Sequence, residues 1–307
     1  MKKKILITGI TGFLGSQLAE YLLSQGNLVI GTKRNSSSLE RCKKFSENIT
    51  WVNLEDQNWK QIIINYKPEV FVHAAWSGVG SIDRNNWHVQ LKNIDFTLTL
   101  LEIANEVKVE KFIGLGSQAE YGLFSGNIDE NQPIKPVSAY GSAKHLTAQL
   151  IQSYCEQNTI NWYWLRLFSF FGEKEADNWF IPTLIKNIYN NNKMEMTPGM
   201  QKYAYMYVKD LSIIIGRIIN SSIKKDIYNV SSKSAFKLKT IVEKIINITG
   251  STNSKINFGA LPYRENQPML VKGDTSKLSK ELGEIVETDF DENLLKVVQY
   301  INNQQNK

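Results

Sequence analysis

The chain has 307 residues, of which 42% are hydrophobic and 21% are charged, and its formal net charge is +6. These fractions are typical of a soluble globular protein, and the length suits one large domain or two interlocked ones. The lysines are scattered, with no basic stripe that interleaves aromatic residues, which disfavours a nucleic-acid-binding protein. No stretch reaches the roughly 18 apolar residues of a membrane span, so we expect no membrane partner.

The cysteines and histidines of the chain show no ligand pattern. Cys42 and Cys155 lack metal-ligand spacing, and the three histidines share no cluster in the sequence: His73, His88 and His145. The sequence therefore predicts neither a structural disulfide nor a zinc site. Two unpaired cysteines fit a protein of the reducing cytoplasm.

A glycine turn follows the first apolar segment. Residues 4–7 (Lys-Ile-Leu-Ile) predict a short strand, and residues 8–15 (Thr-Gly-Ile-Thr-Gly-Phe-Leu-Gly) carry three glycines at intervals of three. Residues 16–25 then show apolar side chains at helical spacing. This order predicts a dinucleotide site, because glycine permits close backbone approach and a helix N-terminus favours a pyrophosphate; the alternative is that the glycines only form turns. The expected contacts are Gly9, Thr11, Gly12, Phe13, Leu14 and Gly15.

The end of the second strand, expected over residues 27–32, favours NADP. An acidic residue at this point would bind the ribose 2′-hydroxyl of NAD, but the chain has Lys33 and Arg34 there. A guanidinium is suited to a 2′-phosphate, although these charges could also belong to a solvated loop. Further expected cofactor contacts follow later strands: Asn53, Leu54, Ala74 and Ala75.

The remaining pattern alternates strands and helices. We expect further strands over 49–54, 70–73, 112–115 and 162–167, and helices over 59–66, 93–107 and 139–157. This alternation predicts an α/β fold with a doubly wound, parallel, Rossmann-type sheet, whose ligands bind at the carboxyl ends of the strands. Beyond about residue 171 the alternation becomes irregular, and residues 203–208 predict a strand.

A tyrosine four residues before a lysine opens the helix expected at 139–157. Tyr140 and Lys144 would share one helix face, where the ammonium favours the phenolate and suits the phenol to proton transfer. Ser117, at the end of the preceding strand, could hold the same substrate oxygen. The same spacing occurs at 189/193, in a polar run where a helix is expected to end, and at 205/209, where a strand is expected and the two positions would be far apart.

These motifs together resemble those of the extended short-chain dehydrogenases/reductases, in the nucleotide-sugar epimerase/dehydratase group. The resemblance covers nearly the whole chain, in the family's order and spacing. It rests on residues 8–15, Ser117, Tyr140/Lys144, the Leu-Arg-x-Phe-x-x-Phe-Gly segment at 165–172 and the Tyr-Val-x-Asp segment at 207–210.

The resemblance implies a catalytic triad and a division of the chain. Ser117, Tyr140 and Lys144 would form the triad, and the last two would also contact the cofactor. Residues 1–170, with returning segments near 205–230, would bind NADP, and residues 171–307 would form a smaller mixed lobe that grips a nucleotide sugar. It also implies a homodimer that pairs helices at about 85–107 and 139–157. Expected substrate contacts are Trp76, Gln118, Ser169, Asn178, Tyr203 and Arg264.

Departures from the family's sequence pattern reduce the number of reactions that we expect this chain to catalyse. Dehydratases of the group carry an Asp-Glu pair after the hydroxyl residue, where this chain has Gln118 and Ala119. The reductive epimerases that make fucose-type sugars have a cysteine at the position of Gln118. The intact machinery is that of a ketone reductase, and the resemblance is closest to reductases of nucleoside-diphosphate 4-keto-6-deoxyhexoses, such as abequose- or fucose-type sugar synthases. They would serve deoxysugar biosynthesis for surface polysaccharide.

Two alternatives to the reductase stay open, an NAD-dependent nucleotide-sugar epimerase and a non-catalytic dinucleotide-binding sensor. A sensor of this fold generally lacks the tyrosine or the lysine. Two further residues near the site favour structural roles: we expect Glu120 to be salt-bridged or solvated and His73 to be a packed histidine.

Overall fold

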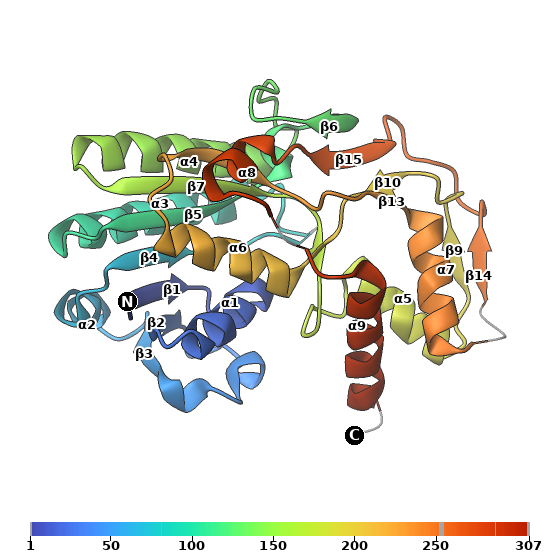
Figure 1. Cartoon of the computed structure of the whole chain (residues 1–307), viewed down its shortest axis with the longest axis horizontal. Helices are drawn as coiled ribbons and strands as arrows, with labels where there is room; N and C mark the ends of the chain where they lie inside the picture. Colours follow the sequence, from blue (N-terminus) through green and yellow to red (C-terminus); the bar gives the residue numbers. More distant parts are fainter. Residues whose placement is uncertain (1, 81, 252–254, 286, 306–307) are drawn as a thin grey trace.

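The computed structural model describes residues 2–80, 82–251, 255–285 and 287–305. A seven-stranded sheet lies at its centre, in the order β12-β7-β5-β4-β1-β2-β3, and every neighbouring pair is parallel (Figure 1). The strands are β1 (Lys4–Thr8), β2 (Leu28–Lys33), β3 (Ile49–Asn53), β4 (Val70–His73), β5 (Lys111–Ser117), β7 (Asn161–Leu167) and β12 (Asp226–Val230).

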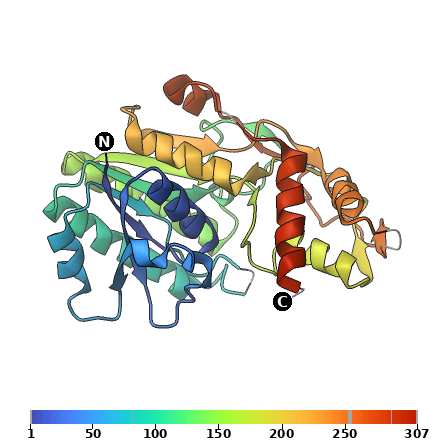
Figure 2. The ribbon, with the colours of Figure 1, turned by 60° about the horizontal axis from the view of Figure 1, so that its bottom comes forward.

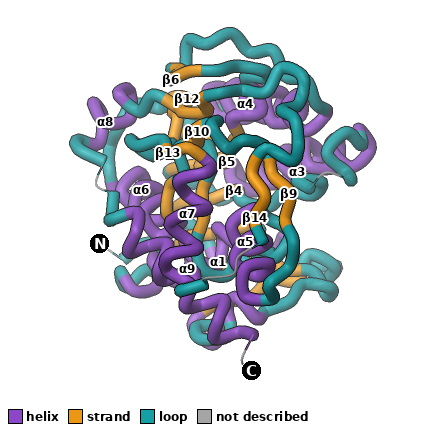
Figure 3. The backbone as a smooth tube through the Cα atoms, turned by 90° about the vertical axis from the view of Figure 1, so that its right-hand side faces the viewer, coloured by secondary structure: helices purple, strands orange, loops and turns teal. Residues whose placement is uncertain are grey.

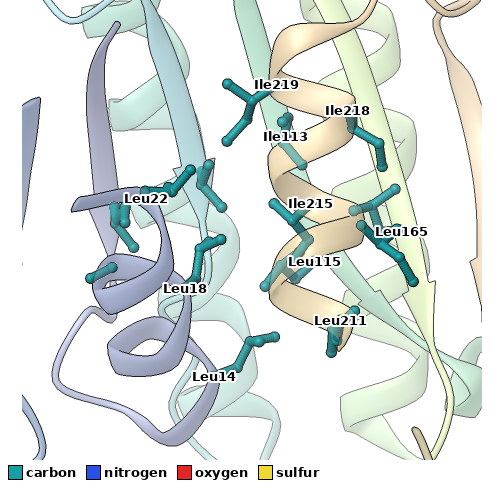
Figure 4. Close-up of a cluster of buried hydrophobic side chains, with 14 of the residues drawn as sticks. Leu14, Leu18, Leu22, Ile113, Leu115, Leu165, Leu211, Ile215, Ile218 and Ile219 are labelled. Carbon is teal, nitrogen blue, oxygen red and sulfur yellow. The ribbon is translucent and has the colours of Figure 1, made fainter. Parts of the chain in front are cut away.

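Helices cover both faces of this sheet, as a doubly wound fold requires. Side chains of α1 (Phe13–Ser24) and α6 (Val208–Asn220) share one hydrophobic core with the sheet, and Figure 4 shows ten of its residues labelled. On the opposite face, α2 (Trp59–Tyr66), α3 (Trp87–Glu106) and α4 (Ala139–Gln157) contribute to a second core. The expected Rossmann-type arrangement is confirmed.

A smaller, mixed part of the molecule lies beside the large sheet (Figures 2 and 3). Its four-stranded sheet has the order β13-β10-β15-β6, with β13 antiparallel to β10. Helices α5, α7 and α9 enclose a core of their own. The elements are β6 (Gly126–Ile128), β10 (Lys202–Tyr203), β13 (Phe236–Lys237), β15 (Leu270–Gly273), α5 (Phe180–Tyr189), α7 (Leu238–Thr249) and α9 (Phe290–Gln305).

Further short elements complete the two parts, and β9 and β14 pack on the core of the smaller one. Two-stranded parallel sheets pair β8 with β11 and β9 with β14, while α8 packs against β12. A 3-10 helix, η3, follows β5 directly. These elements are β8 (Phe170–Phe171), β9 (Met194–Met196), β11 (Met206–Tyr207), β14 (Ile256–Phe258), α8 (Ser276–Leu282) and η3 (Gln118–Glu120), with further 3-10 turns at Glu40–Cys42 and Ser46–Asn48.

The predicted extent of one strand is wrong. The strand predicted over 203–208 is two short strands, β10 and β11, and Val208 already begins α6. The alternating side chains suggest one continuous strand, but the strand is interrupted at Ala204 and Tyr205. The residues before and after this interruption belong to two different sheets. The helix end expected near Tyr189 is confirmed, since α5 stops there.

The parallel register brings the carboxyl ends of the central strands to one edge of the sheet. Thr8 pairs with His73, and Ser117 with Leu167, at this edge. Loops that follow these strands therefore converge there, where ligands of open α/β sheets bind. In the part of the chain that the structure describes, no helix is long and apolar enough to cross a membrane, and no cluster of His, Cys, Asp or Glu could hold a metal ion.

Candidate active site

The glycine turn between β1 and α1 forms a tight, backbone-lined cradle. Gly12 N–H donates to Gly9 O at 2.9 Å, which closes the turn. Gly9 has φ +67°, and a Cβ there would lie 2.6 Å from Ala75 N, so only glycine fits against the end of β4. The hydroxyl of Thr8 accepts a hydrogen bond from Ala75 N at 3.2 Å and ties the same two loops together.

The N-terminus of α1 has the properties of an anion site. Its N-cap, Gly12, provides no side-chain hydrogen bond, and its first turn carries no acidic residue. The first amide groups of this 12-residue helix therefore keep their capacity to bind a negatively charged ligand. A Cβ on Gly12 would meet only Gly9 O within 4 Å, which leaves the space before the helix open. The cradle fits the pyrophosphate of a dinucleotide.

The other residues expected at the cofactor lie around this cradle. Phe13 stacks on Phe170 with ring centroids 5.6 Å apart. Arg34, directly after β2, is exposed, and within the described residues its guanidinium has no ion pair. Leu54 N–H donates to Lys33 O at 2.8 Å, so the ends of β2 and β3 lie together. Of the remaining expected residues, Leu14 is in the first turn of α1, and the others lie at strand ends or in the turns after them: Thr11, Asn53 and Ala74.

The expected triad comes together from β5 and α4. Ser117 is the last residue of β5, while Tyr140 and Lys144 lie in the first two turns of α4. The close approach of α4 to η3 depends on Gly141, because a Cβ there would lie 2.4 Å from Ala119 O. Lys144 Nζ lies 5.9 Å from the ring centroid of Tyr140 and donates to Leu115 O at 2.6 Å.

Burial dominates the electrostatics of these side chains. Desolvation raises the pKa of Tyr140, whereas hydrogen bonding to Ser117 and the nearby charge of Arg84 oppose that rise. Desolvation also lowers the pKa of Lys144 to about 7, against the attraction of the Glu120 carboxylate. The ammonium is therefore easily neutralised in this state of the site.

Glu120 holds the strand end that carries Ser117. Its Oε1 accepts hydrogen bonds from Ser117 N–H and Trp164 Nε1–H, each at 2.9 Å, and its Oε2 pairs with Arg166 Nε at 2.9 Å. The side chain is fully buried, so the salt-bridged state expected from the sequence is correct and the solvated one is wrong. A further hydrogen bond joins Arg166 to the hydroxyl of Tyr121.

His73 is a packed histidine, as expected. Its ring nitrogens contact the hydroxyls of Thr8 at 2.8 Å and Thr97 at 3.0 Å. Burial lowers the pKa of His73 to about 3, so the ring stays neutral at physiological pH.

Two of the residues expected at the substrate lie beside the triad. The Trp76 indole stands edge-on to Tyr140 at 6.2 Å between centroids, and Lys144 Nζ lies 3.6 Å above its ring. Gln118 follows Ser117, and among the described residues no group donates a hydrogen bond to its buried Oε1. A buried acceptor without a donor is costly, so this oxygen is an unsatisfied polar group next to Ser117 in the chain.

The other four expected substrate residues lie in separate segments, and of these four only Tyr203 is on a strand of the smaller sheet. Ser169 lies between β7 and β8, and Asn178 is exposed in the turn before α5. Tyr203 is on β10, and its hydroxyl accepts from Gln267 Nε2 at 3.3 Å. Arg264 is exposed on the same loop as Gln267. The backbone N–H of Gln267 donates a hydrogen bond to Arg264 O.

The sequence patterns missed one residue of the site and the partners of another. Arg84, in the connection between β4 and α3, lies over the ring of Tyr140 with its Cζ 4.3 Å from the centroid. The connection between β4 and α3 is long and irregular, so its residues show no hydrophobic periodicity. No local pattern in the sequence indicates that it packs against α4. The partners of Glu120 lie more than forty residues away on β7 and carry no local signal either.

Comparisons with known proteins place this geometry in a family. A model of the NAD dependent epimerase/dehydratase family matches residues 5–231, so the chain belongs to that family, whose members are enzymes. The CDP-abequose synthase of Salmonella muenchen is 27% identical over 287 residues, which cover 91% of this chain and 92% of the relative. The dTDP-6-deoxy-L-talose 4-dehydrogenase (NAD(+)) of Aggregatibacter actinomycetemcomitans is 27% identical over 280 residues, which cover 88% and 98%.

A solved structure has the same fold. The UDP-glucuronic acid 4-epimerase of Bacillus cereus, in complex with UDP-glucuronic acid and NAD, superposes with a TM-score of 0.84 at 21% identity. The match covers 98% of this chain and 99% of that one. The extended short-chain dehydrogenase/reductase resemblance is thus confirmed at the level of family and fold.

Proposed function

We propose that the protein reduces the 4-keto group of a nucleoside-diphosphate 4-keto-6-deoxyhexose with NADPH. The observation that carries this proposal is the environment of Ser117. The neighbouring Gln118 is neutral, and the nearest carboxylate in the sequence, Glu120, is fully buried and paired with Arg166. A site with a proton-transfer tyrosine but no free carboxylate beside it is suited to hydride transfer rather than to elimination of water.

Each residue of the proposed triad would have a defined role in the reduction. When bound, NADPH supplies a hydride to the carbonyl carbon. Tyr140 gives its proton to the carbonyl oxygen, and the Ser117 hydroxyl donates a hydrogen bond to the same oxygen. Lys144 stabilises the phenolate that remains and holds the ribose of the cofactor. Burial of Tyr140 and Lys144 excludes water from the proton transfer.

Two relatives support this choice of substrate. By name, one is a CDP-abequose synthase and the other a dTDP-6-deoxy-L-talose 4-dehydrogenase, and each is similar over most of the chain. We propose Trp76 and Gln118 as sugar contacts, because both lie beside the triad. Arg264 is proposed as the diphosphate partner, and Tyr203, Ser169 and Asn178 are proposed as further substrate contacts.

The test is an absorbance assay of NADPH oxidation with 4-keto-6-deoxy sugar nucleotides that a dehydratase generates in place. We expect oxidation with at least one member of a panel of CDP-, dTDP-, GDP- and UDP-linked sugars. If none is reduced, and the protein instead interconverts unmodified sugar nucleotides with catalytic NAD, the epimerase is the correct function. Binding of NADPH without any turnover of either kind would support the sensor.

A further inference from the structure

A second cation lies against the proposed acid. Arg84 Cζ is 4.3 Å from the ring centroid of Tyr140, whereas Lys144 Nζ is 5.9 Å from it. Lys144 is also engaged elsewhere, since its ammonium donates to Leu115 O and lies over the indole of Trp76. In this state of the site, Arg84 is therefore the nearer of the two cations to the phenol ring.

The backbone fixes Arg84 against the first turn of α4. Arg84 O accepts a hydrogen bond from Tyr140 N–H at 2.9 Å, and Asn85 Oδ1 accepts one from Ala139 N–H at 3.3 Å. The guanidinium itself donates to Val79 O at 3.2 Å. Because two of these three contacts do not involve the Arg84 side chain, the loop can stay docked when that side chain is changed.

Charged and polar groups face Tyr140 from each element packed against it. Lys144 lies on its own helix, Ser117 on β5, Glu120 on η3 and Arg84 on the connection before α3. The Glu120 carboxylate raises the pKa of Tyr140, while Arg84 lowers it. A cation on the ring face attracts the neutral ring modestly and the phenolate more strongly, because the phenolate carries a full negative charge.

We propose that Arg84 is a positioning residue that strengthens Tyr140 as an acid by stabilising the phenolate left after proton transfer. The proposal rests on the proposed reduction. As a hydride from NADPH adds to the keto carbon, the O–H bond of Tyr140 breaks and its proton moves to the carbonyl oxygen. The negative charge then resides on the phenolate, whose ring lies under the Arg84 guanidinium and whose oxygen shares a hydrogen bond with Ser117.

The test compares Arg84→Met, which keeps an unbranched apolar stem and removes the charge, with Arg84→Lys, which keeps the charge. Lys280→Met, an exposed lysine on α8, controls for the loss of one positive charge. The readout is the titration of Tyr140 in protein labelled with 13Cζ-tyrosine and saturated with NADP+. Its resonance is identified by its loss in Tyr140→Phe.

We expect the titration midpoint of Tyr140 to rise by about half a pH unit or more in Arg84→Met. It should rise less in Arg84→Lys and stay unchanged in Lys280→Met. The kcat/KM profile for reduction should move to higher pH in the same order. Equal midpoints in the wild type and Arg84→Met would overturn the proposal, as would a Tyr140 resonance that does not change with pH in either protein. A raised KM with an unmoved midpoint would make Arg84 a substrate contact instead. The titration needs no substrate, so it stands even if no ketone is reduced.

Discussion

Tyr140 and Lys144 carry the proposed proton transfer, and the two side chains should respond differently to mutation. We expect Tyr140→Phe to lower turnover by a factor of about 10²–10⁴, because it removes the acid and keeps the ring. Its affinity for NADPH should stay close to that of the wild type. Lys144→Ala should lose both turnover and cofactor affinity, because the lysine serves both. Steady-state kinetics and fluorescence titration with NADPH measure the two effects; equal loss of NADPH affinity in both variants would contradict this division.

Arg34 tests the choice of cofactor. We expect NADPH to bind at least tenfold more tightly than NADH, a difference of about 1.4 kcal/mol. Arg34→Ala should remove most of this difference, because the exposed guanidinium is free to pair with a 2′-phosphate. NADH, which lacks that phosphate, is the matched control and should bind nearly unchanged. Identical titration curves for the two cofactors on the wild type would show that the reasoning from the second strand is wrong.

The residues of the triad could be predicted because each lies in a local pattern. Tyr140 and Lys144 share a helix face, and Ser117 ends a strand, so their convergence follows from the doubly wound topology. Arg84 and the buried partners of Glu120 could not be predicted, because their contacts join segments distant in the sequence. The unpartnered Oε1 of Gln118 is likewise a property of packing alone.

At the scale of elements, strongly patterned segments were predicted best. The expected bounds of α2, β4 and α4 coincide with those in the structure, and α4 begins with an N-cap hydrogen bond from Gly141 N–H to the Ser138 side chain. The smaller sheet was not predicted strand by strand. It pairs β6 with β15, two strands of three and four residues that are more than 140 residues apart, and such short segments carry no usable periodicity.

The loop between β8 and α5 contains a partly buried acid that makes stability depend on pH. Burial raises the pKa of Glu175 to about 8, and among the described residues no donor contacts its Oε2. Because the folded-state pKa is raised, the stability of the wild type relative to Glu175→Gln should fall as pH rises from about 4.5 through about 8. We expect Glu175→Gln to gain on the order of 2 kcal/mol over the wild type between pH 5 and pH 9, allowing for partial exposure.

Urea unfolding of both proteins at several pH values measures this difference. Glu47→Gln, at an exposed glutamate on a 3-10 turn, is the matched control and should show little change with pH. A constant difference between Glu175→Gln and the wild type from pH 5 to pH 9 would mean that Glu175 is ionised and solvated.

For the whole molecule, α3 and α4 present the surface on which we expect a dimer. Leu101 is fully buried in the core, whereas Leu98 and Leu146 are 37% and 46% exposed, as helices shared between a core and an interface would be. The two helices pack against each other on one face of the large sheet. We therefore propose a homodimer in which these helices pair with their copies.

Light scattering at micromolar concentration should give the mass of two chains for the wild type and of one chain for the double variant Leu98→Glu/Leu146→Glu. A charge buried at an apolar interface is strongly unfavourable, which is the reason for the expected dissociation. Leu295→Glu replaces a leucine on α9 that is 42% exposed, and it should remain dimeric. A wild type with the mass of one chain would contradict the proposed homodimer.

The central claim, that the protein transfers one hydride to a nucleotide-linked 4-ketohexose, is tested most directly with NADPH deuterated at the transferred position of C4. The product should be a reduced sugar nucleotide that carries one deuterium at the new alcohol carbon, formed in proportion to the NADP+ released. Mass spectrometry of the product detects the label, and Tyr140→Phe should form little of it. A product that is epimerised but unlabelled, formed without consumption of NADPH, would contradict the account.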